Sequence, residues 1–505
     1  MAPTIYEEET SWETVQVQFA ALKEYVLSAA GQVQLHEAEE GMYRRLLALG
    51  RALLEQYATA SGTGYTPGQP PPTAAGEPLA YKGLQTVEYL SIFGAVSLTR
   101  AAYTSPEGGY VYPMDGQWNR PAQKSSYLLQ KWLQAAASEE DYREAAARLH
   151  QVFGFPLVAN VPQRLTQAVG LAVEGYYAQR AAPVATAEGS HLAVTADGKG
   201  VRLRLPRTDQ DDPHPRRGKG EKRGTKREAI VTVEYTFDPV VRTPEQLVED
   251  LMRGRTAAAR QQRRDEHQQR CQQGLPEPRQ PHQPHVRGTL RGKEAAFESL
   301  ADRIERRDPD GAKPIIVLLD GAVALETQIR ARLHAHGLLP RVDAVIVDLW
   351  HVSVYLWEVG TVLWGETAAE RNRWVEDKLR ALLEGRVGRV IGGLRQRLTK
   401  GHLTAVQQRT LRKAITYLDN HRHMMAYDAY LAKGYPIGTG VVEGACNSLV
   451  NDRMEQSGMR WSATGAEAML QQRAVKKNDD WEDFWAYRMA AERRRLYPHT
   501  AKAAA

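Results

Sequence analysis

Three carboxylates stand where an apolar run of this sequence ends or a helix is expected to begin. Asp197 and Asp320 each follow such a run and precede a glycine, in HLAVTADG and KPIIVLLDG. Glu443 lies where the glycine-rich segment PIGTG passes into an expected helix. A lone carboxylate at a buried strand end costs free energy unless it has a partner, and carboxylate oxygens suit Mg²⁺ or Mn²⁺. We therefore interpret Asp197, Asp320 and Glu443 as ligands of a divalent metal that acts on a phosphodiester.

Taken singly, each acid has a simpler explanation. Asp197 could be a turn residue, Asp320 could be a turn residue or the cap of the next helix, and Glu443 could be favoured by the helix dipole alone. Two further residues in VIVDLWHV, Asp348 and His351, compete for the second position. Both stay as secondary candidates, and His351 could equally be a hydrogen-bonded histidine of the core.

The segments around these acids predict a sheet that brings them to one edge. Residues 190–351 contain three strand-rich segments (HLAVTADG, GVRLRLPR and EAIVTVEYTF), then a helix, a strand, a helix and a strand. This is the order of the ribonuclease-H-like fold, an α/β fold with a mixed five-stranded sheet. In that fold the first strand is central and lies beside the fourth, with the fifth one place further out. Because ligands gather where strands end and loops open, we expect Asp197 beside Asp320, and Asp348 further out.

Two insertions are expected in this core. Residues 261–291 are rich in Gln, Arg and Pro and have no apolar period, so we predict a flexible loop there. Residues 352–432 are almost wholly helical and form a helical insertion. The last part of the core, 433–490, then supplies the third acid.

The rest of the chain predicts a mainly helical N-terminal DNA-binding region. Helical spacing of apolar residues and Pro- and Gly-rich breaks divide it into parts that flank the core: helices at 1–60, a linker at 61–80, a β-hairpin module at 81–124 with its turn in SPEGG (105–109), a helical segment at 125–185, and a tail at 491–505. The segment 125–185 could be a helix-turn-helix that reads a major groove or an ordinary helical hairpin.

Composition fits a nucleic-acid partner without establishing one. The 505 residues carry a formal charge of +6, and residues 214–227 hold seven Lys or Arg against one acid. Cys271 and Cys446 are the only cysteines, which excludes a disulfide framework and a cysteine zinc site. The N-terminus has no secretory signal and no run of 18 apolar residues occurs, so we expect a cytoplasmic, nucleoid-associated protein without a membrane segment.

Four residues near the acids are expected to contact DNA. They combine positive charge with one aromatic ring: Lys199, Arg453, Arg460 and Trp461. Solvated helix faces would explain most of these charges equally well.

The chain resembles the ISKra family of bacterial insertion-sequence DDE transposases. The resemblance runs from about 190 to 490 and is carried by TADGKGV, KRGTKREAIVTVEYTFDPVVRTPE, IVDLWHVSVYLWEVG and YPIGTGVVEGACNSLVNDRMEQSGMRWSATGAEAMLQQRA. It implies a ribonuclease-H-like catalytic domain whose acids are Asp197, Asp320 and Glu443. Relatives often carry the cysteine pairs of a zinc ribbon near YTSPEGGYVYPMD, where this sequence has Ser105 and glycines.

The resemblance implies DNA strand cleavage and joining at terminal inverted repeats. We therefore expect two Mg²⁺ or Mn²⁺ ions, double-stranded DNA as partner at the element ends and the target, and a homo-oligomer that joins two ends. The residues also allow a metal-dependent nuclease without strand transfer, or an inactive or domesticated DNA-binding protein.

Overall fold

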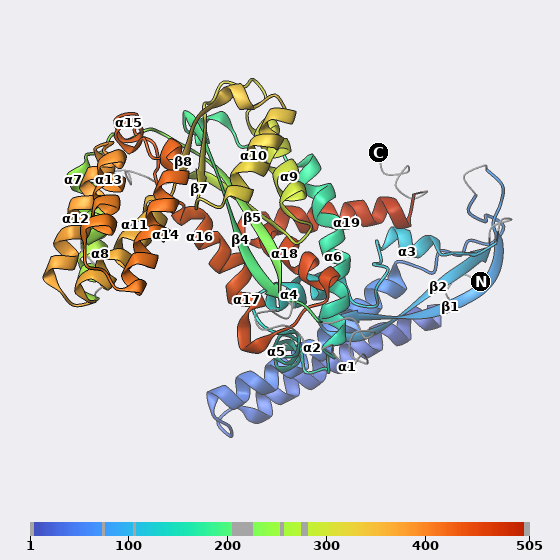
Figure 1. Cartoon of the computed structure of the whole chain (residues 1–505). Helices are drawn as coiled ribbons and strands as arrows, with labels where there is room; N and C mark the ends of the chain where they lie inside the picture. Colours follow the sequence, from blue (N-terminus) through green and yellow to red (C-terminus); the bar gives the residue numbers. More distant parts are fainter. Residues whose placement is uncertain are drawn as a thin grey trace, which may run out of the picture. The chain divides into compact units, whose positions relative to one another are not determined.

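The computed structural model describes residues 5–72, 76–104, 108–204, 226–252, 257–273 and 281–498. The chain forms two compact units, Arg180–Asn478, and Met1–Gln179 with Asp479–Ala505. Figure 1 labels most of the elements of both. Within the described ranges, no helix combines the length and hydropathy that crossing a membrane requires.

The unit Arg180–Asn478 is built on a mixed five-stranded sheet, so the expected α/β class is confirmed. Its strands, in the spatial order β6-β5-β4-β7-β8, are β6 (His282–Thr289), β5 (Lys226–Phe237), β4 (His191–Arg202), β7 (Ile315–Leu319) and β8 (Val342–Val347). The first three are antiparallel neighbours, and β7 and β8 run parallel to β4. All five residues of β7 are buried and apolar, as expected for a parallel strand covered on both faces. The first strand is therefore central and lies beside the fourth, as the sequence predicted.

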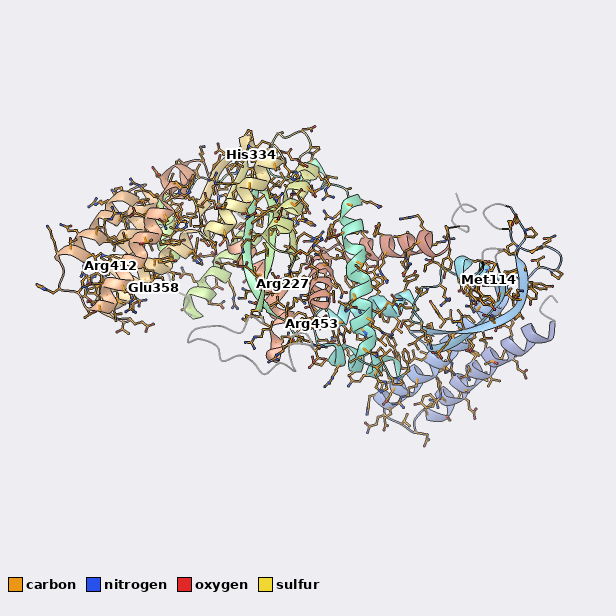
Figure 2. The ribbon with its side chains drawn as sticks, turned by 45° about the vertical axis from the view of Figure 1, so that its right-hand side comes forward. Met114, Arg227, His334, Glu358, Arg412 and Arg453 are labelled. Carbon is orange, nitrogen blue, oxygen red and sulfur yellow. The ribbon has the colours of Figure 1, made fainter. Side chains whose placement is uncertain are left out.

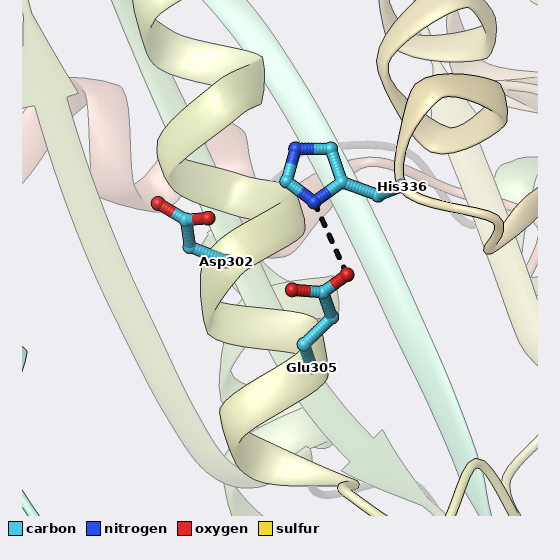
Figure 3. A group of neighbouring side chains, drawn as sticks. All are labelled: Asp302, Glu305 and His336. Carbon is cyan, nitrogen blue, oxygen red and sulfur yellow. Dashed lines mark hydrogen bonds and ion pairs between the residues drawn. The ribbon is translucent and has the colours of Figure 1, made fainter.

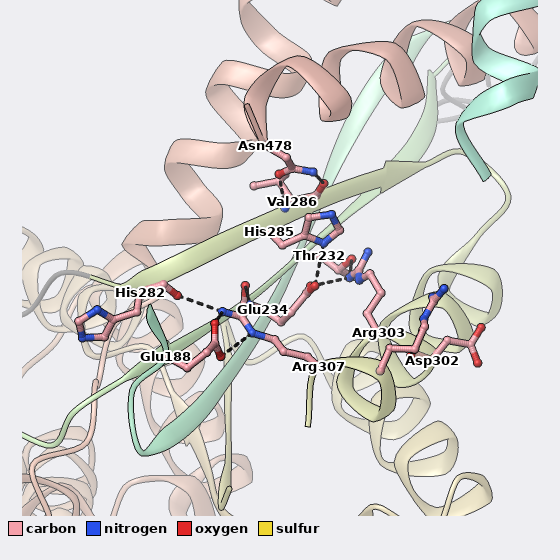
Figure 4. Close-up of polar contacts among 11 residues, drawn as sticks. Glu188, Thr232, Glu234, His282, His285, Val286, Asp302, Arg303, Arg307 and Asn478 are labelled. Atoms are coloured by element: carbon pink, nitrogen blue, oxygen red, sulfur yellow. Dashed lines mark hydrogen bonds and ion pairs between the residues drawn. The ribbon is translucent and has the colours of Figure 1, made fainter. Parts of the chain in front are cut away.

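The edge strand β6 lies inside the segment 261–291, so the expectation of a flexible loop there is wrong for the described part. Helix α8 (Ala257–Gln272) and β6 occupy most of it, while 274–280 lie outside the described residues. The strand has no apolar pattern because charged groups stabilise it: His285 Nδ1 lies 2.7 Å from Glu234 Oε1 of β5, and Arg303 Nη2 lies 2.9 Å from Glu234 Oε2 (Figure 4).

The second strand-rich segment of the sequence is not a separate strand. β4 continues through it to Arg202, and residues 205–225, which include most of the basic run at 214–227, lie outside the described residues. β4 is therefore one long strand of 12 residues that carries Asp197 past its middle.

The helices of this unit are, in chain order, α7 (Pro244–Met252), α8, α9 (Lys293–Arg307), α10 (Val323–Ala335), α11 (Leu349–Trp364), α12 (Ala369–Leu383), α13 (Val387–Lys400), α14 (Ala405–Asn420), α15 (Tyr427–Ala432), α16 (Gly440–Cys446), α17 (Asp452–Met454) and α18 (Ala463–Lys477). Of these, α9 packs on one face of the sheet, where Arg303 donates to Thr232 of β5, and α16 and α18 pack on the opposite face. A π-helix, Asn447–Asn451, follows α16 directly. Helices α11 to α14 form a bundle on which Glu358 and Arg412 lie (Figures 1 and 2); this bundle is the helical insertion.

The other unit contains long helices and a small antiparallel sheet. Its elements are α1 (Ile5–Ala29), α2 (Leu35–Ala60), β1 (Ala80–Ser91), β2 (Gly94–Thr104), β3 (Tyr110–Val111), α3 (Pro113–Gln117), α4 (Tyr127–Ala137), α5 (Tyr142–Phe153), α6 (Asn160–Gln179) and α19 (Trp481–Leu496). β1 and β2 form one hairpin, whose turn lies between the paired residues Ser91 and Gly94. β2 and β3 form a second antiparallel pair in which Thr104 is opposite Tyr110, so the segment 105–109 connects two paired strands, as expected. Of that segment, 105–107 lie outside the described residues.

The C-terminal segment belongs to this second unit. The sequence placed 479–490 in the core and 491–505 in a tail, but α19 runs to Leu496. Its Phe484 and Trp485 are buried, and Arg488 Nη1 donates to Gln130 Oε1 of α4 at 3.1 Å. Phe484 packs against Tyr176 of α6, and Arg488 binds α4, so these side chains hold α19 in this unit. The local composition of the segment did not indicate these contacts.

Candidate functional site

Asp197 and Asp320 lie at the same level on adjacent parallel strands. In the β4–β7 pair Leu192 is opposite Ile315 and Thr195 is opposite Leu318. Continuing this register by two residues sets Asp197 opposite Asp320. Neighbouring strands are about 4.8 Å apart. The two half-buried aspartates are therefore neighbours across the sheet, at the level where β7 ends.

The face of the sheet that carries Asp197 is the face covered by the C-terminal helices. Asp197 is paired with Val231, and Val231 with Gly288, so all three share one face. A Cβ on Gly288 would lie 2.7 Å from Leu449 of the π-helix. The π-helix and the helix before it, α16, therefore lie on the Asp197 side of the sheet.

Cys446, at the end of α16, connects Asp197 with Glu443. Burial raises the pKa of the Cys446 thiol, and the Asp197 carboxylate raises it further through its charge and a hydrogen bond from the thiol. The exposed Glu443, one helical turn earlier, adds to the same shift. Two of the three candidate acids therefore act on the same buried thiol. From the sequence, Cys446 served only to exclude a disulfide framework and a cysteine zinc site.

The turn that carries Asp320 is held by the helical insertion. Asp320 Oδ1 accepts from the backbone N–H of Ala322 at 2.8 Å. Tyr417 of α14 donates its hydroxyl to the Asp320 carbonyl at 2.9 Å, and His421 Nε2 lies 2.6 Å from the Gly321 carbonyl oxygen. Gly321 has φ +92°, and a Cβ there would lie 2.6 Å from the Tyr417 hydroxyl, so this position needs glycine. No pattern in the sequence points to Tyr417 or His421.

Asp348 is a buried cap that joins β8 to the start of α16. It is 1% exposed, its Oδ1 accepts from the Trp350 N–H at 2.8 Å, and its Oδ2 accepts from the hydroxyl of Thr439. Thr439 directly precedes α16. Asp348 follows the β7–β8 register one strand beyond Asp320, as the strand order predicted. Both of its oxygens are thus occupied inside the protein, which suits a positioning residue.

The remaining secondary candidate, His351, is exposed on α11. The alternative that made it a hydrogen-bonded histidine of the core is therefore wrong.

A buried arginine supports the π-helix that follows Glu443. Arg473 of α18 donates from Nε to the Leu449 carbonyl at 2.9 Å and from Nη2 to the Ser448 carbonyl. A π-helix leaves the usual i→i−4 ladder and is often found at functional sites. The Arg473 guanidinium therefore supplies hydrogen-bond donors to backbone carbonyls of the π-helix.

The four residues expected to contact DNA fall into two groups. Lys199 is half-buried on the same strand face as Asp197, and Arg460 is exposed; their DNA role stays a prediction. Arg453 and Trp461 are 1% and 5% exposed, with the Arg453 guanidinium 4.8 Å from the centre of the Trp461 ring. Trp461 also donates its indole N–H to the Met454 carbonyl at 3.2 Å. This burial does not fit a DNA-facing role and makes both part of the packing beside the end of β4.

An open groove of about 550 Å³ lies at the end of the sheet where β5 begins. Basic and acidic side chains alternate along it, including Arg227 (Figure 2), Glu228, Lys293 and Glu294. Lys293 and Glu228 form an ion pair across the groove. Its mixed charge identifies no ligand by itself.

Among the described residues one cluster brings metal-binding side chains together, and it does not include Asp197, Asp320 or Glu443. Asp302 and Glu305 of α9 and His336 after α10 bring ligand atoms within 4.8 Å of one another (Figure 3). Both ring nitrogens of His336 are engaged, with Glu305 at 3.1 Å and Glu298 at 3.2 Å. Although burial opposes it, these hydrogen bonds raise the pKa of His336. Two carboxylates thus occupy both ring nitrogens, and the cluster is better described as an ion-pair network of His336 with Glu298 and Glu305.

Comparison of the sequence with protein-family models gave no match, and comparison with curated proteins gave none either.

Proposed function

We propose that the chain is a DNA transposase with a ribonuclease-H-like catalytic domain, which cleaves DNA and joins it at the ends of an insertion sequence. The observation that carries this proposal is the common level of Asp197 and Asp320 on adjacent parallel strands. The contact of Cys446 with Asp197, which ties the Glu443 helix to the same strand, supports it. The strand order of the five-stranded sheet is the one expected for the fold.

The three acids fit Mg²⁺ or Mn²⁺ by donor type and accessibility. All are carboxylates, two are half-buried and one is exposed, and such cations take oxygen ligands while keeping several waters. Asp197, Asp320 and Glu443 would hold the metal. Bound metal would supply an activated oxygen nucleophile and charge stabilisation for phosphoryl transfer.

The protein itself would contribute positioning. The hydrogen bonds from Tyr417 and His421 fix the Asp320 turn, and the Thr439–Asp348 contact fixes the start of the Glu443 helix. Phosphoryl transfer depends mainly on such placement and on positive charge. Lys199 and Arg460, together with the basic run at 214–227, are the proposed contacts to the DNA backbone. The protein would act at the nucleoid in the cytoplasm.

The test is a cleavage and joining assay with the full-length protein. The substrate is a duplex that carries the DNA flanking the coding segment, incubated with a target plasmid in Mg²⁺. We expect Mg²⁺-dependent nicks and joined products, and a loss of at least 100-fold in Asp197→Asn and Asp320→Asn, as for removal of a key electrostatic group. Asp302→Asn, which changes an exposed carboxylate on α9, is the matched control and should keep full activity.

The same assay separates the alternatives. Cleavage without joined products would identify a nuclease, and binding without Mg²⁺-dependent nicking would identify a DNA-binding protein. Full activity of Asp320→Asn, with loss in Asp348→Asn, would overturn the choice of the second ligand.

A further inference from the structure

The helical hairpin α1–α2 carries a continuous apolar face that no other described element of its own unit covers. Trp12, Phe19 and Val26 of α1 are 51%, 59% and 45% exposed and follow one another at intervals of seven residues. On α2, Leu46 and Leu53 are seven residues apart and both are about half exposed. An interval of seven returns to nearly the same side of a helix, so each helix carries one exposed apolar row.

Both rows lie on the same side of the hairpin. The two helices contact each other where Arg45 stacks on the Tyr25 ring at 3.7 Å. Val26 follows Tyr25 by one position and Leu46 follows Arg45 by one, so each exposed row is about 100° further round its helix in the same sense. Since the helices run in opposite directions, equal rotations bring the rows to one side. The hairpin therefore presents a two-helix apolar surface, with Tyr57, 64% exposed, extending it.

We propose that this surface, the face formed by Trp12, Phe19, Val26, Leu46, Leu53 and Tyr57, binds the same face of a second copy of the chain. The two hairpins would then pack as four helices around a shared apolar core. A twofold arrangement of this kind is self-complementary and closes without leaving a free apolar face.

The area of the face matches what a stable dimer needs. Each of the six side chains offers on the order of 100 Å² of exposed apolar surface, about half of a large side chain. The face then presents roughly 600 Å² per copy. With the polar rim that surrounds an interface core, two copies bury about 1,200–1,600 Å², the range of specific protein complexes.

The charge of the hairpin argues against nucleic acid as the occupant. Residues 5–60 contain nine acidic residues (Glu7, Glu8, Glu9, Glu13, Glu24, Glu37, Glu39, Glu40 and Glu55) and four basic ones (Lys23, Arg44, Arg45 and Arg51), a net charge of 4 − 9 = −5. Phosphates would be repelled by this charge, although the exposed rings could stack on bases. A second apolar face with the same heptad spacing matches the exposed rows, and a second copy provides one, with the acidic side chains of both copies left at the solvated rim.

The test is the molar mass of the full-length protein without DNA. Light scattering and sedimentation equilibrium between about 0.5 and 50 µM should give twice the chain mass of 56.4 kDa, and the dimer should persist in 1 M NaCl because the contact is apolar. The double variant Phe19→Ser/Leu46→Ser should weaken the dimer at least 100-fold. Its matched control, Val158→Ser/Leu171→Ser, removes two side chains that are 60% and 85% exposed on the same unit and should dimerise normally.

A second measurement needs no variant. Hydroxyl-radical oxidation of Trp12, Phe19 and Tyr57 in the wild-type protein should fall as the concentration rises, while oxidation of Leu171 stays constant. A monomer at 50 µM, an unchanged dimer in the Phe19→Ser/Leu46→Ser variant, or oxidation independent of concentration would each overturn the proposal.

Discussion

Replacing Thr439 by valine tests whether the buried Asp348 carboxylate holds the Glu443 helix in place. Valine matches threonine in shape and removes only the hydroxyl that donates to Asp348 Oδ2. A hydrogen bond to a charged group contributes about 1.5–3 kcal/mol, and an acceptor left unpaired in the interior loses its water as well. Asp348 is 1% exposed and keeps its bond from the Trp350 N–H. We therefore expect Thr439→Val to destabilise this region by about 2 kcal/mol.

Hydrogen exchange is the suitable assay, because a chain of two units need not unfold in one step. A loss of about 2 kcal/mol should raise the exchange rates of the amides in 348–356 and 437–446 about 30-fold. The cleavage rate should fall at least 10-fold without a matching loss of DNA affinity, since small misplacements of catalytic groups are costly.

Two control variants separate the hydrogen bond from general damage. Thr439→Ser keeps the hydroxyl and should exchange within about threefold of the wild type. Thr399→Val removes an exposed hydroxyl on α13 whose acceptors are backbone carbonyls of its own helix and should change nothing. Wild-type exchange in Thr439→Val, or equal exchange in the Ser and Val variants, would refute the reasoning.

Three further predictions concern the same unit. Burial lowers the pKa of His285 from 6.5, so the unfolded chain binds a proton that the folded chain excludes; stability should fall as the pH drops through about 6.5, by up to about 1.4 kcal/mol per pH unit, and His285→Gln should flatten the profile of melting temperature between pH 7.5 and 5.5. Gly434 has φ +73° and a Cβ there would lie 2.5 Å from the Val240 backbone nitrogen, so Gly434→Ala should destabilise by about 2 kcal/mol or more, whereas Gly392→Ala, in open space on α13, should stabilise by about 1 kcal/mol. Arg473→Met should expose the π-helix carbonyls and cost about 3 kcal/mol, seen as faster exchange of the amides in 447–451.

The central strands could be predicted because buried strands appear in the sequence as apolar runs. KPIIVLLDG and HLAVTADG each form a buried strand. The rules of strand connection allow only a few positions in the sheet for a strand that follows an α-helical crossover. The position of Asp197 beside Asp320 on adjacent strands could therefore be predicted from the strand order, and the register of β4 and β7 agrees with it.

The edge strand β6 could not be predicted in this way. Its buried residues include His285, Arg287 and Thr289, which a composition analysis assigns to solvent. Each of them has a polar partner on another element: His285 pairs with Glu234 of β5, and Arg287 and Thr289 donate to Gln471 and Glu467 of α18. Arg453, whose charge suggested DNA, is buried with its guanidinium against the Trp461 ring. A residue type predicts only average exposure, and the individual partners of each side chain decide these cases.

The helical insertion between β8 and α16 has a structural consequence that its sequence did not indicate. Its helix α14 fixes the Asp320 turn through Tyr417 and His421, and the segment that leaves it ends in Thr439, bound to Asp348. Both contacts act within a few residues of a candidate metal ligand. Loosening the bundle should therefore disturb the second and third acids together while leaving Asp197, on the central strand β4, in place. The insertion is thus better understood as part of the site's framework than as an addition to the sheet.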